Sequence, residues 1–304
     1  MTYSAGSDIL ASDYNTFVTN VNSVWNSLWG QTALSGVSAG GTVTAAQWST
    51  LATTITNAYL HISGSNPSVA TPSAGQNINV IANLASAVTY IQNNPYSCYA
   101  YFPTSTSASS NAGPRGSANA AWSATWTQTL GFNSTTSRSR WFYAGGTVLI
   151  TYSKTTTGTL MDPTWNAFVA ACSVITFTST STTKVIQGVT YQGTNKTGGS
   201  GTPTTLATNI GYDQLTGSDQ TIFLQYYPTY PYTGSYIQTL ARLSGNDVIF
   251  TTNWVQPASG YAFEPVNIST GGETTMQQKT PEQTYITNTW GGNSNNPTNT
   301  STVV

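Results

Sequence analysis

The spacing of apolar residues changes at about Pro95, and this change constrains the fold more than any other feature of the sequence. Before Pro95, apolar residues recur every three or four positions, which is typical of amphipathic helices. After it, short runs of β-branched and aromatic residues alternate with polar ones, and Gly, Asn and Pro separate the runs. The two patterns in succession predict an α+β chain with a helical part followed by a β part.

The helical part contains an internal repeat. Residues 4–25, SAGSDILASDYNTFVTNVNSVW, are similar to residues 38–59, SAGGTVTAAQWSTLATTITNAY. The first copy predicts a helix within 8–29. The second predicts a helix that begins at the capping-box spacing of Thr44 and Gln47. A third helix is predicted in the stretch NINVIANLASAVTYIQNNP, which ends at Pro95. Single helices of this length are marginal alone, so we expect three to cover one another in a repeat module over residues 1–95.

The remainder of the chain is predicted to be mostly β. Seven runs have strand character, at 123–130, 145–154, 173–181, 184–192, 221–230, 236–244 and 246–255. The stretch MDPTWNAFVAAC, 161–172, has helical spacing and predicts one short crossover helix. We expect residues 96–290 to form an antiparallel, jelly-roll-like β-sandwich. Residues 291–304, GGNSNNPTNTSTVV, predict a tail that is flexible unless a partner orders it.

Charge is scarce, and this excludes several classes of partner. Only 6% of residues are charged, against about 25% in ordinary soluble domains. The net charge of −1 does not provide for phosphate neutralisation, so nucleic acid is not expected as a partner. Polar residues break every apolar stretch before it reaches the length of a membrane span, so no membrane insertion is expected. The 12% aromatic content argues against disorder, since it supplies a core to bury.

Two features concern the compartment in which the chain folds. The start, MTYSAGSD, has neither the basic region nor the apolar region of a secretory signal, so we expect folding in a cytoplasm. Cys98 and Cys172 stand 74 residues apart without a metal-binding spacing. We expect them to be buried free thiols, with a disulfide as the alternative.

Residues that usually carry catalysis are few. His61, the single histidine, ends the second predicted helix and is interpreted as a surface or capping residue. Asp162 and Asp247 have the sequence context of turns. A carboxylate pair drawn from Asp213, Asp219 and Glu264 remains open as a catalytic alternative. We predict no catalytic residue, cofactor or metal, and interpret the chain as a non-enzyme.

A cluster of aromatic residues offers the best candidate for a contact surface. The stretch FLQYYPTYPYTGSYI, residues 223–237, combines six aromatic residues with two prolines. Tyrosine offers a flat apolar ring with a polar tip, which suits a subunit interface or the stacking of a sugar. The same spacing is also typical of cross-strand packing on a sheet. The candidate interface or glycan-contact residues are Tyr226, Tyr227, Tyr230, Tyr232, Tyr236 and Trp254.

Two parts of the sequence resemble virion structural proteins of tailed bacteriophages, particularly those of marine and cyanobacterial phages. The segment SRSRWFYAGGTVLITYS, 137–153, followed by DPTWNAFVAACSVITF, carries the first resemblance. The matching residues are Arg140, Phe142, Ala144, Gly145, Gly146 and Val148, then Trp165 and Phe168. The helix starts carry the second, through Ile9, Ala11, Tyr14, Asn15 and Phe17, and through Val43, Ala45, Trp48 and Leu51. The chain has Thr147 where the family often has Glu, and Pro-Thr-Trp for Asn-Asp-Trp, so no role of those acids is carried over.

The resemblance implies assembly into a particle. We therefore expect a structural subunit of a tailed-phage virion, in a tail fibre, neck or other appendage, assembled in the host cytoplasm. The expected partners are further copies of the chain, as a homo-oligomer such as a trimer, and other virion proteins. Two alternatives stay open within the particle: a receptor- or glycan-binding module that contacts host surface glycan, and a head-decoration or collar protein. A polysaccharide-degrading enzyme is the alternative outside this class.

Overall fold

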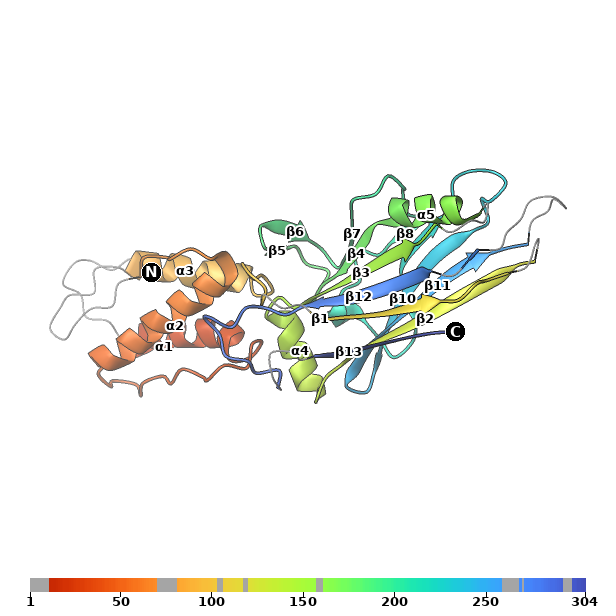
Figure 1. Ribbon diagram of the computed structural model, residues 1–304. Coiled ribbons are helices and arrows are strands. Elements are labelled where there is room, and N and C mark those ends of the chain that lie inside the picture. The colour runs from red at the N-terminus through yellow and green to blue at the C-terminus, as the bar shows by residue number, and fades with distance from the viewer. Residues whose placement is uncertain are drawn as a thin grey trace.

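The computed structural model describes residues 11–69, 81–102, 106–116, 120–156, 161–258, 268–269, 271–291 and 297–304. It is a mixed α+β structure with antiparallel sheets. Three helices gather at one end and the sheets extend from them to the other end (Figure 1). The predicted succession of a helical and a β part is confirmed at this level.

The helical part holds α1 (Ala11–Trp25), α2 (Ala45–Ser63) and α3 (Ile81–Asn93). Each copy of the repeat contributes one of the first two helices. The capping box predicted at the start of α2 is present, because the Thr44 side chain accepts from the Gln47 amide and Gln47 bonds back to the Thr44 amide. The stretches 4–10 and 77–80 of the predicted elements lie outside the described residues.

Asparagines of α1 hold the connection between the first two helices. Asn15 exchanges two hydrogen bonds of 2.8 Å with the backbone of Val37. About two helical turns later, Asn22 exchanges two hydrogen bonds of 2.9 Å with the backbone of Leu34. These amide side chains satisfy the backbone of a segment that has no regular secondary structure, and so fix its path along α1.

Two sheets form most of the β part. The five-stranded sheet has the order β1-β12-β3-β4-β7, and the six-stranded sheet has the order β13-β2-β11-β10-β9-β8. The strands of the first sheet are β1 (Thr106–Ala112), β12 (Gly272–Lys279), β3 (Thr147–Lys154), β4 (Val174–Phe177) and β7 (Thr194–Thr197). Those of the second are β13 (Thr298–Val303), β2 (Trp122–Gly131), β11 (Asp247–Gln256), β10 (Tyr236–Ser244), β9 (Gln220–Tyr226) and β8 (Thr205–Leu206).

The two sheets pack face to face around a shared core. The hydroxyls of Tyr152 and Thr239 bridge them at 2.8 Å, and the rings of Phe177 and Phe250 meet edge to face at 5.3 Å. Much of the core volume is aromatic, as expected from the composition. The largest fully buried side chains include Trp126, Trp141, Trp165, Trp254, Phe142, Phe168, Phe177, Phe223 and Phe250.

Two helices and a short turn also belong to this part of the chain. The predicted crossover helix is confirmed as α5 (Met161–Cys172). The helix α4 (Thr135–Tyr143), capped by Ser134, was not predicted, because its sequence TTSRSRWFY has no clear apolar stripe. A short 3-10 turn, η1 (Tyr212–Gln214), precedes β9.

Two predictions about strands are wrong. The run 184–192 is a hairpin of β5 (Lys184–Ile186) and β6 (Val189–Tyr191), because Gln187 and Gly188 both have positive φ and form a two-residue turn. The end of the chain is not a tail as far as it is described, because β13 pairs with β2 from Thr298 to Val303. Residues 292–296 lie outside the described residues.

The helical and β parts share a buried junction. The indole nitrogen of Trp29 donates to the carbonyls of Pro95, at 2.9 Å, and Tyr143, at 3.1 Å. The stretch after β12 returns to the helical part, where Gln31 donates to the carbonyl of Thr287 and accepts from its amide, both at 2.9 Å. The predicted division at residues 95 and 96 therefore crosses a packed interface, and residues near 287 contact both parts.

Candidate functional site

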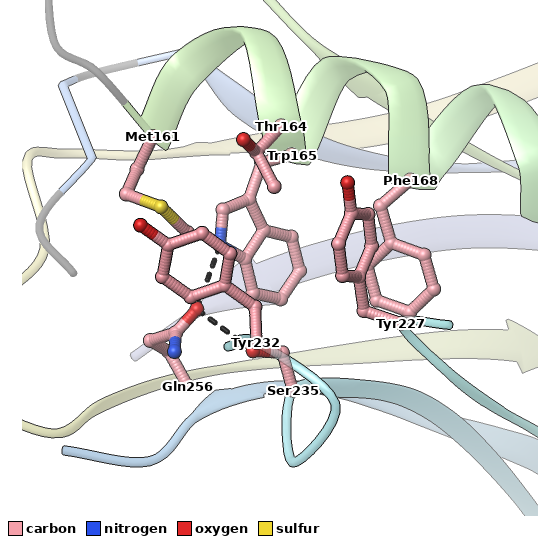
Figure 2. A pocket seen from close by; sticks show the side chains of 8 residues that line it. All are labelled: Met161, Thr164, Trp165, Phe168, Tyr227, Tyr232, Ser235 and Gln256. Carbon is pink, nitrogen blue, oxygen red and sulfur yellow. Dashed lines mark hydrogen bonds between the residues drawn. The ribbon is translucent and has the colours of Figure 1, made fainter. Parts of the chain in front are cut away.

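The six predicted contact residues divide into three groups in the structure. Tyr226, at the end of β9, is 42% exposed, and Tyr230, in the β9–β10 loop, is 66% exposed. Tyr236, at the start of β10, pairs its ring with that of Tyr226 at 5.4 Å. Tyr227 and Tyr232 are half-buried and turn toward α5 (Figure 2). The sequence therefore identified two exposed tyrosines and a separate pair of tyrosines packed toward α5.

Trp254 is the exception among the six, because it is fully buried. Its ring stacks on Trp165 of α5 with centroids 5.4 Å apart and planes 9° apart. Trp126 packs on it from β2 at 4.8 Å. A ring enclosed by two other indoles has no face left for a sugar, so the expectation that Trp254 contacts a glycan is wrong. Alternation along β11 was the available signal, since Val248, Phe250 and Trp254 share one face.

A shallow hollow lies between α5 and the β9–β10 loop. It is lined by Met161, Thr164, Trp165, Phe168, Tyr227, Tyr232, Ser235 and Gln256 (Figure 2). The space between these side chains is about 140 Å³, including the part open to solvent, and its interior does not hold a water molecule. It is a crease between packed side chains, much smaller than the roughly 300 Å³ at which ligand pockets begin.

Polar contacts beneath the hollow hold its walls together. The Gln256 side-chain oxygen accepts from the Trp165 indole at 3.2 Å and from the Ser235 hydroxyl at 2.9 Å (Figure 2). Phe168 and Tyr227 meet edge to face at 5.5 Å above this network. These contacts join α5 to the β9–β10 loop and to β11. The packing of α5 against the β9–β10 loop and β11 is therefore sufficient to explain the partial burial of Tyr227 and Tyr232.

The carboxylates raised as catalytic alternatives have separate partners. Asp213 accepts a hydrogen bond of 2.7 Å from the Tyr143 hydroxyl, and burial raises the pKa of its carboxyl. Asp219 forms an ion pair with Arg242 at 3.2 Å on the surface of the six-stranded sheet. Glu264 lies outside the described residues.

Asp162 does not have the turn role that the sequence indicated. It lies in the first turn of α5, fully buried, and pairs with Lys154 of β3 at 3.0 Å. The Ser269 amide also donates to it at 3.1 Å. A buried carboxylate needs such partners, and here they tie the start of α5 to the end of β3.

A second buried cation, Lys184, was not identified from the sequence. Its ammonium donates to the carbonyl of Thr180 at 2.6 Å and to the hydroxyl of Thr178 at 3.1 Å. Burial lowers the pKa of Lys184 to about 8. Both partners are neutral groups of the segment before β5. The two hydrogen bonds from the ammonium therefore hold that segment in place.

His61 is buried, so its interpretation as a surface or capping residue is wrong. Its Nε2 lies 2.9 Å from the carbonyl oxygen of Ala144, and its ring meets Trp29 edge to face at 4.8 Å. Burial lowers the pKa of the imidazole to about 4, although the Ala144 carbonyl acts in the opposite direction. The imidazole is therefore neutral near pH 7 and acts as a packed link between α2 and the end of α4.

The remaining predictions concern thiols, metals and membranes. Cys98 and Cys172 are free and buried, as predicted, and burial raises the pKa of Cys172 to about 12. Within the described ranges, no group of three His, Cys, Asp or Glu side chains is arranged to hold a metal ion. Within the same ranges, no helix is long and apolar enough to cross a membrane.

Comparisons with known protein families, with curated proteins and with solved structures found no match for this chain.

Proposed function

We propose that this chain is a structural subunit of a particle, and specifically of a tailed-phage virion, in a tail fibre, neck or other appendage. The observation that carries the proposal is an uncharged area over β13, β2 and part of β11 on the outer face of the six-stranded sheet. Two cross-strand rows run over β13, β2 and β11: Thr302, Thr127 and Thr251 in one, and Val304, Thr125 and Asn253 in the other. Their side chains are exposed or half-buried and none is charged.

A face of this kind suits burial against a neighbouring subunit. Burying a charge removes it from water, and the attraction to its new partner often does not offset this desolvation penalty. Hydroxyl and amide groups are cheaper to bury when they find hydrogen bonds, and threonine also offers a methyl group for packing. The finer parts of the proposal are a repeat module, built from copies 4–25 and 38–59, and a jelly-roll-like topology for the sandwich. The resemblance noted in the sequence supplies the class of particle.

Immunogold labelling of intact particles tests the proposal. Antibodies against the purified chain are expected to label particles at one defined position, with regular copy number per particle. A matched antibody against a non-structural protein of the same lysate is the control. If the chain stays in the soluble fraction after particles are sedimented, and no particle is labelled, the proposal is overturned.

A receptor- or glycan-binding module is the second candidate, and the exposure of Tyr226 and Tyr230 favours it. The ring of Tyr226 also pairs with that of Tyr236 at 5.4 Å, and tyrosine rings with their hydroxyl tips suit the stacking of a sugar. A glycan array tests this candidate. Binding is expected to fall at least about tenfold in Tyr226→Ala and Tyr230→Ala, and to persist in Tyr191→Ala, which alters a tyrosine of β6. An array without binding by the unaltered chain excludes the candidate.

A further inference from the structure

The outer face of the six-stranded sheet carries an aromatic pair near the β9–β10 loop. Tyr226 and Tyr236 stand opposite each other in the register of β9 and β10, and their ring centroids lie 5.4 Å apart. Ile237, the next residue of β10, is buried, so Tyr236 points to the outer side of the sheet. Tyr226 is 42% exposed. The two rings therefore form an accessible aromatic surface with hydroxyl tips.

Two amide side chains follow this pair on the same face. Gln238 lies two residues beyond Tyr236 on β10, and Asn253 of β11 is its partner in the register. Their strand neighbours Thr239 and Trp254 are buried, whereas both amide residues are half-buried. Side chains directly opposite each other on one face have Cβ atoms about 5 Å apart. The amide pair lies about 7 Å along the strands from the tyrosine pair.

A hydroxyl group holds one end of each amide. The Thr125 hydroxyl donates to the Asn253 Oδ1 at 2.9 Å, and the Gln238 Nε2 donates to the Thr221 hydroxyl oxygen at 3.1 Å. Within the described part of the chain, the Asn253 Nδ2 and the Gln238 Oε1 have no hydrogen-bond partner. The two amides thus present one donor and one acceptor in a fixed orientation. Fixing one end of each amide in advance reduces the entropy that is lost when a ligand binds.

This arrangement suits a neutral sugar. Each hydroxyl of a sugar ring can both donate and accept, so two neighbouring hydroxyls match an amide donor beside an amide acceptor. The apolar face of the same ring can pack on tyrosine. The strands β2, β9 and β11 contain no basic residue, and Arg242 of β10, four positions from Gln238, is paired with Asp219 at 3.2 Å. An anionic sugar would therefore find no free cation on these strands.

We infer that Tyr226, Tyr236, Gln238 and Asn253 bind a neutral sugar unit of an extended glycan. The ring of the sugar lies on the tyrosines, and two of its hydroxyls bond to the amide pair. The open face of a sheet lets the glycan continue on both sides of the bound unit. The site rests on the second candidate function, because it names the residues and the ligand class for that function, and it involves no contact between subunits.

Binding of oligosaccharides to the full chain, measured by isothermal titration calorimetry, tests the inference. The probes are neutral oligomers of glucose, mannose, galactose and N-acetylglucosamine, with oligogalacturonate as the anionic probe. The unaltered chain is expected to bind at least one neutral oligomer with a Kd below about 1 mM, and to bind oligogalacturonate at least about tenfold more weakly. The free chain is used because Asn253 also belongs to a row proposed as an assembly surface.

Two variants remove the amide groups at nearly constant side-chain volume. Gln238→Leu and Asn253→Leu are each expected to weaken binding at least about fivefold, since a sugar hydroxyl loses its partner. Gln192→Leu is the matched control, because it removes an exposed amide between β6 and β7, away from the six-stranded sheet. It is expected to bind as the unaltered chain does. Circular dichroism checks that all three variants are folded.

A methylated probe tests the amide pair without any change to the protein. O-methylation of the neutral oligomer that binds best keeps the sugar ring but removes its hydroxyl donors, and is expected to weaken binding at least about tenfold. Equal binding of the methylated probe, undiminished binding by Gln238→Leu and Asn253→Leu, or stronger binding of oligogalacturonate overturns the inference. If Tyr226→Ala still lowers binding in those cases, the second candidate stands. A chain that binds none of the neutral oligomers overturns both, whereas particle labelling decides independently whether the chain belongs to a virion.

Discussion

Acid should weaken this protein through His61, the buried histidine between α2 and α4. Its pKa is lowered to about 4 in the folded chain, against about 6.5 in an unfolded chain. The unfolded state therefore takes up a proton first as the pH falls. Stability is unaffected well above pH 6.5, falls between pH 6.5 and about 4, and has lost the full contribution below that.

The size of the loss follows from the two pKa values. Between about pH 7.5 and pH 5, the proton bound by the unfolded state alone lowers the free energy of unfolding by about 2 kcal/mol. The slope approaches about 1.4 kcal/mol per pH unit near pH 5. Glu282 adds little here, because its pKa is lowered from 4.5 and its contribution is lost only at lower pH.

Urea denaturation at a series of pH values, followed by circular dichroism of the helices, measures this loss. His61→Gln is the matched variant, because an amide can still donate to the Ala144 carbonyl but does not titrate. Its absolute stability is expected to be lower, since the contact with Trp29 is lost. Asp213, whose pKa is raised, acts with the opposite sign, but it does so in both proteins and cancels in their difference.

The reasoning is refuted if His61→Gln loses as much stability as the unaltered chain between about pH 7.5 and 5. It is also refuted if the stability difference between the two proteins changes by less than about 0.5 kcal/mol in that window, because the imidazole would then be accessible to protons in the folded state.

Three further predictions concern buried polar contacts. Asp162→Asn leaves the Lys154 ammonium without its carboxylate and should lower the free energy of unfolding by about 3 kcal/mol. The double change of Asp162→Leu with Lys154→Met removes both charges and should cost less. Urea denaturation measures both effects. Asn22→Ala removes both bonds to the Leu34 backbone and should cost about 2 kcal/mol, with faster amide exchange at Leu34 as the local readout; unchanged exchange would contradict it. Cys172 should react with a thiol reagent only at the rate of unfolding, and fast reaction in the native protein would show that its site is open.

The parts of the fold that the sequence predicted are those with a strong local signal, either a repeated apolar spacing or a capping motif. The helix α5 was predicted because Trp165, Phe168 and Cys172 share one face, and each of them is buried. The start of α2 was predicted from two residues, Thr44 and Gln47, because the capping box is a local hydrogen-bonding motif.

Elements without an apolar signal were missed. β13, with the sequence TNTSTV, has one exposed face and one half-buried face, so it shows no alternation of apolar and polar residues. It pairs with β2 through backbone hydrogen bonds between residues more than 160 positions apart in the sequence. The local amino-acid composition does not reveal such a pairing. α4 was missed for a related reason, since its burial of Trp141 and Phe142 depends on tertiary contacts.

For the candidate site, the sequence located exposed tyrosines but not their grouping. Consecutive residues of a strand point to opposite faces, so Tyr226 and Tyr227 separate at the end of β9. Trp254 and His61 were misassigned although their apolar neighbours shared a face with them. In both cases the prediction relied on the residue type. The position of the side chain on the buried face of its strand or helix determined its burial instead.

The chain places much of its positive charge inside. Of its eight basic residues, Arg138, Lys154 and Lys184 are buried, and each donates to at least one backbone carbonyl. Arg138, for example, donates to the Gly245 carbonyl at 2.6 Å, in the turn between β10 and β11. The rows over β13, β2 and β11 carry uncharged side chains such as Thr302, Thr127 and Asn253. If the chain assembles as proposed, these rows are surfaces whose burial removes no charged side chain from water.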